Sequence, residues 1–181
     1  IFTHLDREFG ELAGRQVGII GLGTIGRSVA GVARAFGANV VYHSTSGKNL
    51  DVAEYRHLPL EELLATSDVV SIHCPLNDQT QNLLDEHRLR RMKPSAYLLN
   101  MGRGGIVDEK ALVRLLDDNG LAGAALDVLA TDPVAANSPL LKVRNRERLY
   151  ITPHIAWASI EARRRLIERT AQSIKHHFGM S

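Results

Sequence analysis

Short apolar runs alternate along the chain with longer stretches in which apolar residues recur at helical spacing. This alternation is typical of strand and helix units wound around a parallel sheet. The predicted strands are Gln16–Ile20, Asn39–His43, Asp68–His73, Ala96–Asn100, Ala122–Val128 and Leu149–Thr152. The predicted helices are Ile25–Phe36, Leu60–Ala65, Asp85–Met92, Glu109–Asp118 and Ser159–His177. The pattern predicts an α/β fold in three layers, a doubly wound parallel sheet. Several of its strands are rich in Val, Ile and Leu with little alternation, as in strands covered on both faces.

The segment Leu129–Arg148 departs from this regular order. It carries Pro133 and Pro139 among small polar residues and is predicted to be a long irregular connection. Loops of this length inside compact domains are usually functional or mobile. Elsewhere, Pro59 precedes a predicted helix, where proline is tolerated, and Ser159 is a candidate N-cap of the last helix.

The strongest local motif consists of Gly21, Gly23 and Gly26, a GxGxxG that follows an apolar strand and opens an alanine-rich helix. Gly21 permits the tight turn, Gly23 lets the backbone approach a pyrophosphate, and Gly26 lets helix and strand pack closely. The phosphates are expected at the free N–H groups of the helix N-terminus. A glycine triplet also occurs in ordinary strand-to-helix turns, but here a second strand follows the helix. This context favours a Rossmann-type dinucleotide-binding site.

The end of the second strand bears on the choice of cofactor. An NAD-binding fold normally has Asp or Glu there, about 20 residues after the glycines, to bind the adenosine 2′-OH. The sequence Tyr42–Lys48 contains no acid, so a 2′-phosphate is not repelled. Hydrogen-bond donors for such a phosphate are present at Ser44, Thr45, Ser46 and Lys48. No arginine is available as a clamp, and a polar turn that accepts either cofactor is the alternative, so NADP is favoured only slightly.

Two more loops follow predicted strands and carry Cys74 and Met101, and the predicted strand Ala122–Val128 carries Asp127 near its end. Ligands in open α/β sheets bind outside the carboxyl ends of the strands, so these loops are expected beside the glycine loop. Arg103 lies among glycines in the second of them. An arginine there can bind a carboxylate through two parallel hydrogen bonds. A structural ion pair is the alternative for Arg103.

His154 lies just past the last predicted strand, followed by Trp157. A histidine exchanges protons near neutral pH, and hydride transfer to a keto group needs a proton delivered to the oxygen. Asp132 is a candidate partner, because a carboxylate beside a histidine favours the imidazolium. Considered alone, His154 would more often be structural. The other histidines are interpreted as structural: His4, His43, His57, His73, His87, His176 and His177.

Composition excludes several function classes. The 22 basic and 20 acidic side chains leave a net charge of only +2. Glu161 and Glu168 interleave the basic helix that contains Arg163–Arg165, so a solvated helix face is favoured over a nucleic-acid footprint. His176 and His177 point to different sides of that helix, so no metal site is expected.

The remaining composition is that of an ordinary globular domain, with 44% hydrophobic and 23% charged residues in 181. This length accommodates one domain with a core. No apolar run approaches the roughly 20 residues of a membrane span, and the N-terminus lacks the apolar segment of a signal peptide. The single cysteine cannot form an internal disulfide, which agrees with a reducing compartment. We expect a cytoplasmic location without a membrane partner.

The ordered motifs GLGTIG, SIHCPL, NMGRGGIVDE, ALDV and TPHIAWAS resemble the coenzyme-binding domain of the D-isomer-specific 2-hydroxyacid dehydrogenases, and they cover nearly the whole chain. The resemblance implies hydride transfer between NAD or NADP and a small 2-keto or D-2-hydroxy acid. It implies that Arg103 binds the substrate carboxylate and carbonyl and that His154 is the general acid/base. Asp132 stands where the family usually has glutamate, so the acid is shorter by one methylene. The PHIAW ending is most similar to glycerate or hydroxypyruvate reductases.

The resemblance also implies a set of cofactor-binding residues. Thr24 and Ile25 are expected at the phosphates, and Ser44 occupies the place of the ribose-binding acid. Other residues are expected on the adenosine side of the cleft or at the nicotinamide half. The full set is Gly21, Gly23, Thr24, Ile25, Gly26 and Ser44, then Cys74, Pro75 and Thr80 on the adenosine side, and Met101, Gly102 and Asp127 at the nicotinamide half.

Members of this family build a second, substrate-covering domain largely from residues that precede the glycine-loop strand, and only 15 residues precede Gln16 here. We therefore expect residues 1–14 to be a linker from a substrate domain. Residues 15–157 are expected to form the dinucleotide-binding domain, and residues 158–181 a helix returning toward the other domain. The family's coenzyme domain forms a dimer interface, so a homodimer is expected. The alternatives are a cofactor-sensing interaction module, as in the similar carboxy-terminal-binding corepressors, and an inactive truncated fragment.

Overall fold

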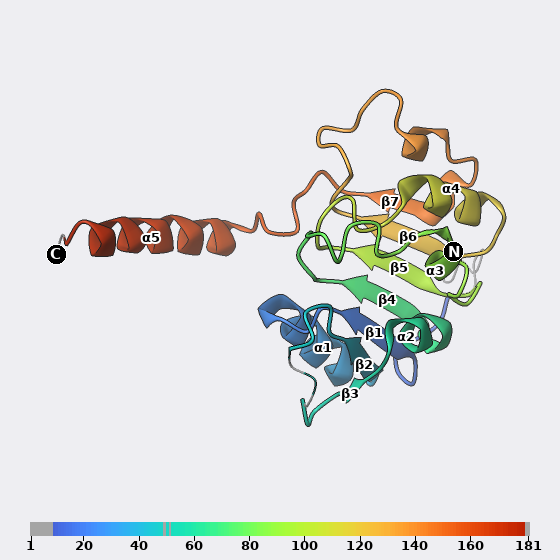
Figure 1. The fold of residues 1–181 in the computed structure, drawn as a ribbon, viewed down its shortest axis with the longest axis horizontal. Helices are drawn as coiled ribbons and strands as arrows, with labels where there is room; N and C mark the ends of the chain where they lie inside the picture. The colour runs from blue at the N-terminus through green and yellow to red at the C-terminus, as the bar shows by residue number, and fades with distance from the viewer. Residues whose placement is uncertain (1–8, 49, 51, 180–181) are drawn as a thin grey trace, which may run out of the picture.

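In the computed structural model, which describes residues 9–48, 50 and 52–179, helices flank one parallel sheet (Figure 1). The described strands lie in the order β3-β2-β1-β4-β5-β6-β7. They are β1 (Gln16–Ile20), β2 (Asn39–His43), β3 (Arg56–His57), β4 (Val69–Ile72), β5 (Tyr97–Asn100), β6 (Gly123–Leu126) and β7 (Leu149–Ile151). The helices are α1 (Thr24–Ala35), α2 (Leu60–Thr66), α3 (Glu86–Leu89), α4 (Glu109–Asp117) and α5 (Ile160–His177). The strand order reverses between β1 and β4, as in a doubly wound sheet. The predicted Rossmann-type α/β fold is confirmed.

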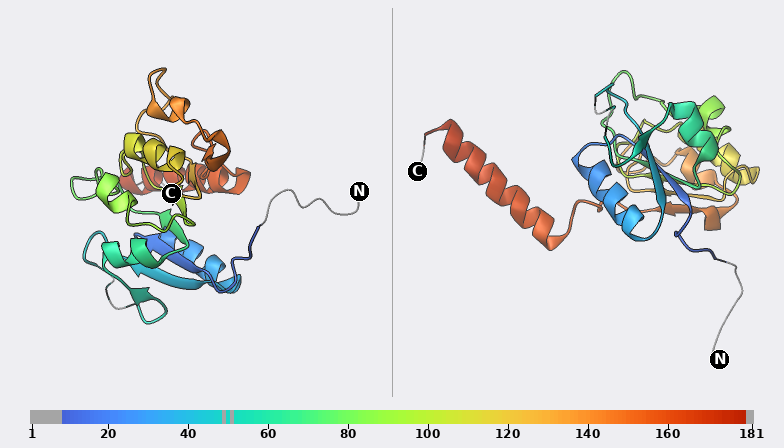
Figure 2. Two further views of the ribbon diagram at one scale, coloured as in Figure 1. Left: turned by 90° about the vertical axis from the view of Figure 1, so that its right-hand side faces the viewer. Right: turned by 90° about the horizontal axis from the view of Figure 1, so that it is seen from below.

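Two hydrophobic cores pack against opposite faces of the sheet. Figure 2 shows the helices that lie on its two sides. Val17 and Ile19 of β1 pack with Ala30 and Ala33 of α1 on one face. On the other face, β4, β5 and β6 pack against the leucines of α2, α3 and α4. A Cβ at Gly18 would lie 2.6 Å from a methyl carbon of Leu63, so glycine lets α2 lie directly on β1. The three predicted layers are therefore present.

The layer that contains α1 covers only part of its face, because α1 contacts β1 and β2. On β5, Leu98 is fully buried under the other layer, whereas Tyr97 is 52% exposed. Tyr150 of β7 is 73% exposed. Among the described residues, β5 and β7 are thus covered by helices on one face only, whereas β1 and β4 are among the strands with buried residues on both faces.

Most predicted elements are present with shorter bounds. Strands predicted at Asp68–His73 and Ala122–Val128 are four residues each, because their ends already belong to the loops of the carboxyl edge. The helix predicted at Asp85–Met92 ends at Leu89. β3 was not predicted, since two polar residues form no apolar run. The connection Leu129–Arg148 is less irregular than predicted: it contains two short 3-10 helices, Pro139–Lys142 and Arg146–Arg148.

α5 extends away from the sheet, and none of its residues is buried (Figure 1). Ser159 is its N-cap, as predicted, because its hydroxyl accepts a hydrogen bond from the N–H of Ala162 at 3.1 Å. Within the described residues, no helix combines the length and the apolar character needed to cross a membrane.

Candidate functional site

The glycine loop joins β1 to α1 with the geometry predicted for a phosphate site. Gly21 has φ +94°, and a Cβ there would lie 2.7 Å from the backbone N of Cys74. A Cβ at Gly26 would lie only 2.2 Å from the carbonyl oxygen of Gly21. At Gly23 a Cβ would meet nothing within 4 Å, so space lies above the loop. No side chain caps α1 and no acid lies in its first turn, which leaves its N-terminal N–H groups available to an anion.

The turn after β2 contains Ser44, which is predicted to lie at the adenosine ribose. The hydroxyl of Ser44 contacts the carbonyl of Lys48, and the hydroxyl of Ser46 accepts a hydrogen bond from the Lys48 N–H at 3.3 Å. The turn is therefore closed by its own side chains. It is acid-free and exposed or half-exposed, and one lysine side chain is available nearby.

The loop after β4 contains the predicted residues Cys74, Pro75 and Thr80. Burial raises the pKa of the Cys74 thiol to about 11, so the sulfur is a packing group below the glycine loop. Thr80 is fully buried, and its hydroxyl donates to the carbonyl of Pro75 at 2.6 Å. The side chain of Thr80 therefore holds the loop together and does not face the cleft. A cavity of about 470 Å³ lies here, lined by the start of α1 and by the loops after β4 and β5: Ile25, His73, Cys74, Pro75, Leu76, Met101, Gly102 and Arg103.

The loop after β5 presents Arg103 to solvent at the rim of this cavity. Its guanidinium donates to the carbonyl of Gly102 at 2.8 Å, and no ion pair to it is present among the described residues. Asn100 shapes the loop: its side chain donates to the Arg103 carbonyl at 3.0 Å and accepts from the Gly102 N–H at 3.1 Å. The structural ion pair considered as an alternative for Arg103 is thus absent from the described part of the chain.

Asp127 directly follows β6 and is only 3% exposed. Its carboxylate accepts three hydrogen bonds, from the Thr152 hydroxyl at 2.6 Å and from the N–H groups of Ile155 and Ala156 at 2.9 and 3.0 Å. Burial alone would raise the pKa of Asp127, but these hydrogen bonds outweigh it and the pKa lies below its usual value. Asp127 therefore anchors the loop that carries His154.

His154 lies in that anchored loop, in the left-handed region with φ +52°. Its Nδ1 is 3.1 Å from Oδ2 of Asp132, which approaches from the long connection 22 residues earlier in the sequence. Both side chains are partly exposed, at 40% for His154 and 54% for Asp132. An ionised carboxylate only accepts hydrogen bonds, so Nδ1 is the donor.

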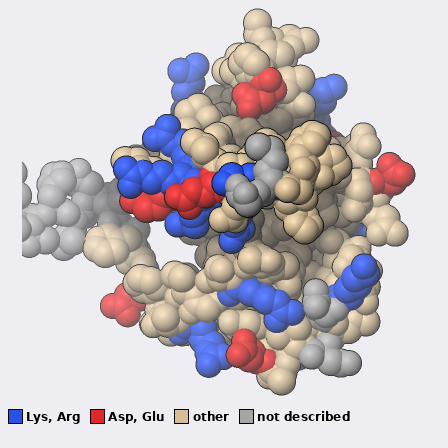
Figure 3. All heavy atoms as spheres, turned by 90° about the vertical axis from the view of Figure 1, so that its left-hand side faces the viewer, with Lys and Arg blue, Asp and Glu red and all other residues tan. Residues whose placement is uncertain are grey.

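All of these loops leave the same edge of the sheet, the left-hand edge of Figure 1. Figure 3 looks onto this edge and shows it hollowed between the two halves of the sheet. Arg103 follows β5 and His154 follows β7, with β6 between them. Strands in a sheet lie about 4.8 Å apart, so these two strand ends are on the order of 10 Å apart. The structure thus brings His154 and Asp132 into contact and places Arg103 at the same edge.

Known proteins share the fold of this chain and part of its sequence. The model of the D-isomer specific 2-hydroxyacid dehydrogenase NAD-binding domain matches residues 3–156. The chain belongs to this family. Its D-2-hydroxyacid dehydrogenase domain is 44% identical over 168 residues to a glyoxylate reductase from Aeropyrum pernix, covering 91% of this chain and 49% of that protein. It is 37% identical over 166 residues to a hydroxypyruvate reductase from Blautia hydrogenotrophica, covering 91% and 51%.

A solved structure gives the same result for the fold of the dehydrogenase domain. D-lactate dehydrogenase from Aquifex aeolicus, complexed with NAD and lactic acid, superposes with a TM-score of 0.86 at 32% identity. The match covers 94% of this chain and 55% of that one. The chain therefore spans about half the length of the relatives it matches.

Sequence reasoning missed several residues that shape the edge of the dehydrogenase domain. Asn100 and Thr152 were not singled out, although each forms hydrogen bonds that fix a loop. His73, which is interpreted as structural, is also one of the residues that line the 470 Å³ cavity. Burial lowers the pKa of His73, whose Nε2 lies 2.9 Å from the hydroxyl of Ser71. Clusters of three or more His, Cys, Asp or Glu side chains able to hold a metal do not occur in the described ranges.

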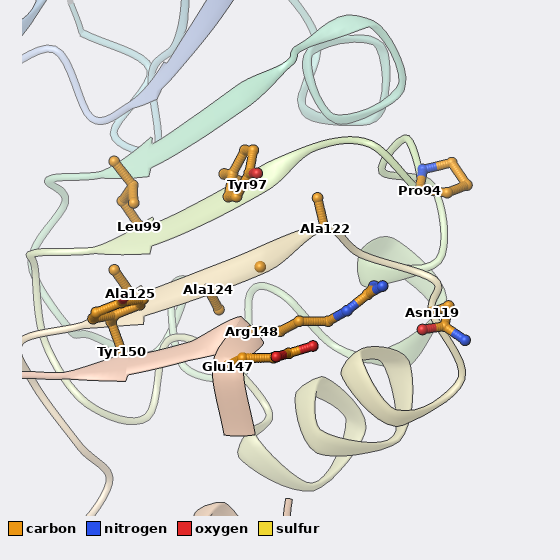
Figure 4. Close-up of a pocket in the computed structure, with 11 residues that line it drawn as sticks. Pro94, Tyr97, Leu99, Asn119, Ala122, Ala124, Ala125, Glu147, Arg148 and Tyr150 are labelled. Atoms are coloured by element: carbon orange, nitrogen blue, oxygen red, sulfur yellow. The ribbon is translucent and has the colours of Figure 1, made fainter. Parts of the chain in front are cut away.

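A second cavity, of about 620 Å³, lies on the uncovered face of β5–β7 and contains none of the predicted site residues (Figure 4). Tyr97 and Tyr150 stand on either side of the small residues of β6. This cavity lies where α1 does not cover the sheet, because α1 contacts β1 and β2 on this face. It contains none of the glycine-loop, Arg103 or His154 side chains, so the carboxyl edge remains the candidate functional site of the dehydrogenase domain.

Proposed function

We propose that this chain is the coenzyme-binding part of an oxidoreductase that interconverts a 2-keto acid and a D-2-hydroxy acid. The observation that carries the proposal is the contact of His154 with Asp132 at the edge where the glycine loop and Arg103 also lie. A nicotinamide dinucleotide, when bound, supplies or accepts the hydride. The residues fit such a group: the glycine loop leaves space above Gly23, and the N-terminus of α1 has no competing cap.

The chain's own residues provide proton transfer and substrate binding. Because Asp132 accepts a hydrogen bond from Nδ1 of His154, Nε2 is the nitrogen left to exchange a proton with the substrate oxygen. Arg103 carries an exposed guanidinium with no ion-pair partner in the described part of the chain, and this guanidinium binds the substrate carboxylate. Asp127 holds the His154 loop in place and touches neither substrate nor proton.

We further propose a modest preference for NADPH over NADH. The support is the acid-free turn after β2, in which Ser44 occupies the position of the usual ribose-binding carboxylate and Lys48 is four residues away. Replacement of Ser44 by aspartate is expected to weaken NADPH binding about tenfold or more, because a carboxylate repels the 2′-phosphate, while NADH binding is retained or improved. Fluorescence titration with each cofactor measures this. An unchanged ratio of the two dissociation constants would remove Ser44 from cofactor selection.

The division of the chain also belongs to this proposal. α5 has no buried residue and leaves the domain from the same edge as the site, which supports the assignment of residues 158–181 to a connection toward a substrate-covering domain. The assignment of residues 1–14 to a linker lies mostly outside the described residues. Homodimer formation and a cytoplasmic location stay predictions.

Turnover tests the proposed function. The probe is oxidation of NADPH or NADH with hydroxypyruvate or glyoxylate, by the chain alone and by a fusion with the remaining half of a glyoxylate reductase relative. His154→Gln is expected to lower the rate by about 10²–10⁴-fold, because it removes the general acid. The control is His87→Gln, which alters an exposed histidine of α3. A fusion that binds cofactor but oxidises none, or a His154→Gln rate equal to that of the control, would exclude the proposal.

A further inference from the structure

Packing does not hold Asp132 in position. Residues 130–134 are all exposed, so no apolar side chain fixes this part of the connection to the domain. In the described ranges, residues 129–134 make only two hydrogen bonds. One is the contact of Asp132 with His154, and the other runs from the N–H of Ala130 to Oε1 of Glu109 at 2.7 Å.

Glu109 is well placed to be a fixed anchor. It is the first residue of α4 and is half-buried, and the preceding Asp108 caps the helix by accepting from the N–H of Lys110 at 2.9 Å. Leu112 and Leu116 of the same helix are fully buried in the core. The Glu109 carboxylate therefore projects from a rigid element. A charged acceptor at 2.7 Å also makes a stronger hydrogen bond than a neutral one.

A second contact, with the loop that carries Arg103, holds the same stretch of chain. A Cβ at Gly104 would lie 1.7 Å from the carbonyl oxygen of Leu129, so the connection rests directly on the loop that carries Arg103. Leu129 is thus fixed by this close approach and by its side chain, which packs against the core, whereas Ala130 is fixed by its hydrogen bond to Glu109. Asp132 follows two residues later, which limits the positions that its carboxylate can reach.

We propose that Glu109 is a positioning residue for proton transfer: by holding the Ala130 N–H, it places the Asp132 carboxylate against Nδ1 of His154. This rests on the role proposed above for His154. Glu109 touches neither substrate nor cofactor in this scheme. Its effect is on the imidazole, because a neutral histidine whose Nδ1 donates to a carboxylate is held in the Nδ1–H tautomer, with Nε2 free to take up a proton.

The test is the tautomer ratio of His154, measured by ¹⁵N NMR of the imidazole ring in the intact chain at about pH 9, where an ordinary histidine is neutral. Loss of signals in His154→Gln assigns the ring. Two substitutions of Glu109 separate the effect of its side-chain length from the effect of its charge. Glu109→Gln keeps an acceptor oxygen at the same distance but removes the charge, whereas Glu109→Asp keeps the charge and shortens the side chain by one methylene. Glu86→Ala is the matched control, since Glu86 also follows an aspartate N-cap and begins α3.

We expect the Nδ1–H tautomer to predominate in the unmodified chain, in Glu109→Gln and in Glu86→Ala. In Glu109→Asp the ratio is expected to shift toward the Nε2–H tautomer by about fivefold or more, because the hydrogen bond to Ala130 is lost. Equal ratios in Glu109→Asp and the unmodified chain would overturn the proposal, and so would a shift in Glu109→Gln as large as that in Glu109→Asp.

The amide spectrum of each variant shows whether it is folded, and both Glu109 variants keep the Asp108 cap. The tautomer ratio needs no turnover. If the proposed function is wrong, the fusion oxidises no cofactor although the His154 tautomer ratios are as expected. If only the positioning role is wrong, the tautomer ratios alone differ from those expected.

Discussion

Gly26→Ala is expected to weaken dinucleotide binding by about 100-fold or more, equivalent to roughly 2.8 kcal/mol of binding free energy. The added Cβ would lie 2.2 Å from the carbonyl oxygen of Gly21, a contact that backbone cannot absorb without moving. Either α1 or the turn at Gly21 must shift, and both carry N–H groups that are proposed to bind the phosphates. Isothermal titration of each protein with NADPH and NADH measures the change.

Gly31→Ala is the matched control for this result. Gly31 lies in the same helix, but the nearest atom to a Cβ there is the Tyr55 hydroxyl oxygen at 4.0 Å. Alanine at Gly31 is expected to leave binding unchanged and to stabilise the helix by about 0.5–1 kcal/mol, because glycine is unfavourable inside helices. If Gly26→Ala bound the cofactors within threefold of Gly31→Ala, the glycine loop would not be the phosphate site.

Asp127→Ala is expected to have the largest effect on stability, lowering the free energy of unfolding by about 3–5 kcal/mol. The substitution removes three hydrogen bonds to a charged acceptor and leaves the N–H groups of Ile155 and Ala156 unpaired at the start of the His154 loop. Urea unfolding monitored by circular dichroism measures the loss. Asp132→Ala is the control: it removes an exposed carboxylate with one hydrogen bond to His154, and about 0.5 kcal/mol is expected.

The same carboxylate gives a pH dependence with a defined sign. The pKa of Asp127 is lowered in the folded chain, so the stability that its charge contributes is present above the ordinary pKa of aspartate and is lost as pH falls through the folded pKa. The difference in stability between the unmodified chain and Asp127→Asn should therefore shrink between about pH 5 and about pH 2. A difference that is constant or grows over this range would contradict the assigned hydrogen bonding.

The sequence predicted best where local pattern and packing agree. The β1–α1–β2 unit was predicted almost to the residue, because Gly21 and Gly26 are dictated by the close approach of the backbone and the flanking strands are continuous apolar runs. β3 was not predictable, since its two polar residues pair with β2 only in the folded chain. Exposure of Tyr97 was also unforeseen, because a strand pattern does not reveal which helices cover a sheet.

In the candidate site, too, some contacts were predictable from the sequence and others were not. The contact between His154 and Asp132 was predicted from chemistry, since a proton-transferring histidine needs a carboxylate and the long connection offered one. The partners of Asp127 were not predicted, because they lie 25–29 residues away along the chain and two of them are backbone N–H groups without a sequence signature. The contact of Glu109 was not predicted for the same reason, since its partner is the backbone N–H of Ala130.

The central claim is that the carboxyl edge of the sheet is a nicotinamide dinucleotide site that ends at His154. A titration of the ¹⁵N-labelled chain with NADPH, followed by two-dimensional NMR, tests it most directly. The account predicts saturable shifts at the amides of Thr24, Ile25 and Gly26 and at the loop residues Met101, Gly102 and His154, with none on the uncovered face at Tyr97 and Tyr150. Shifts confined to that uncovered face, or no saturable shift at the glycine loop, would contradict it.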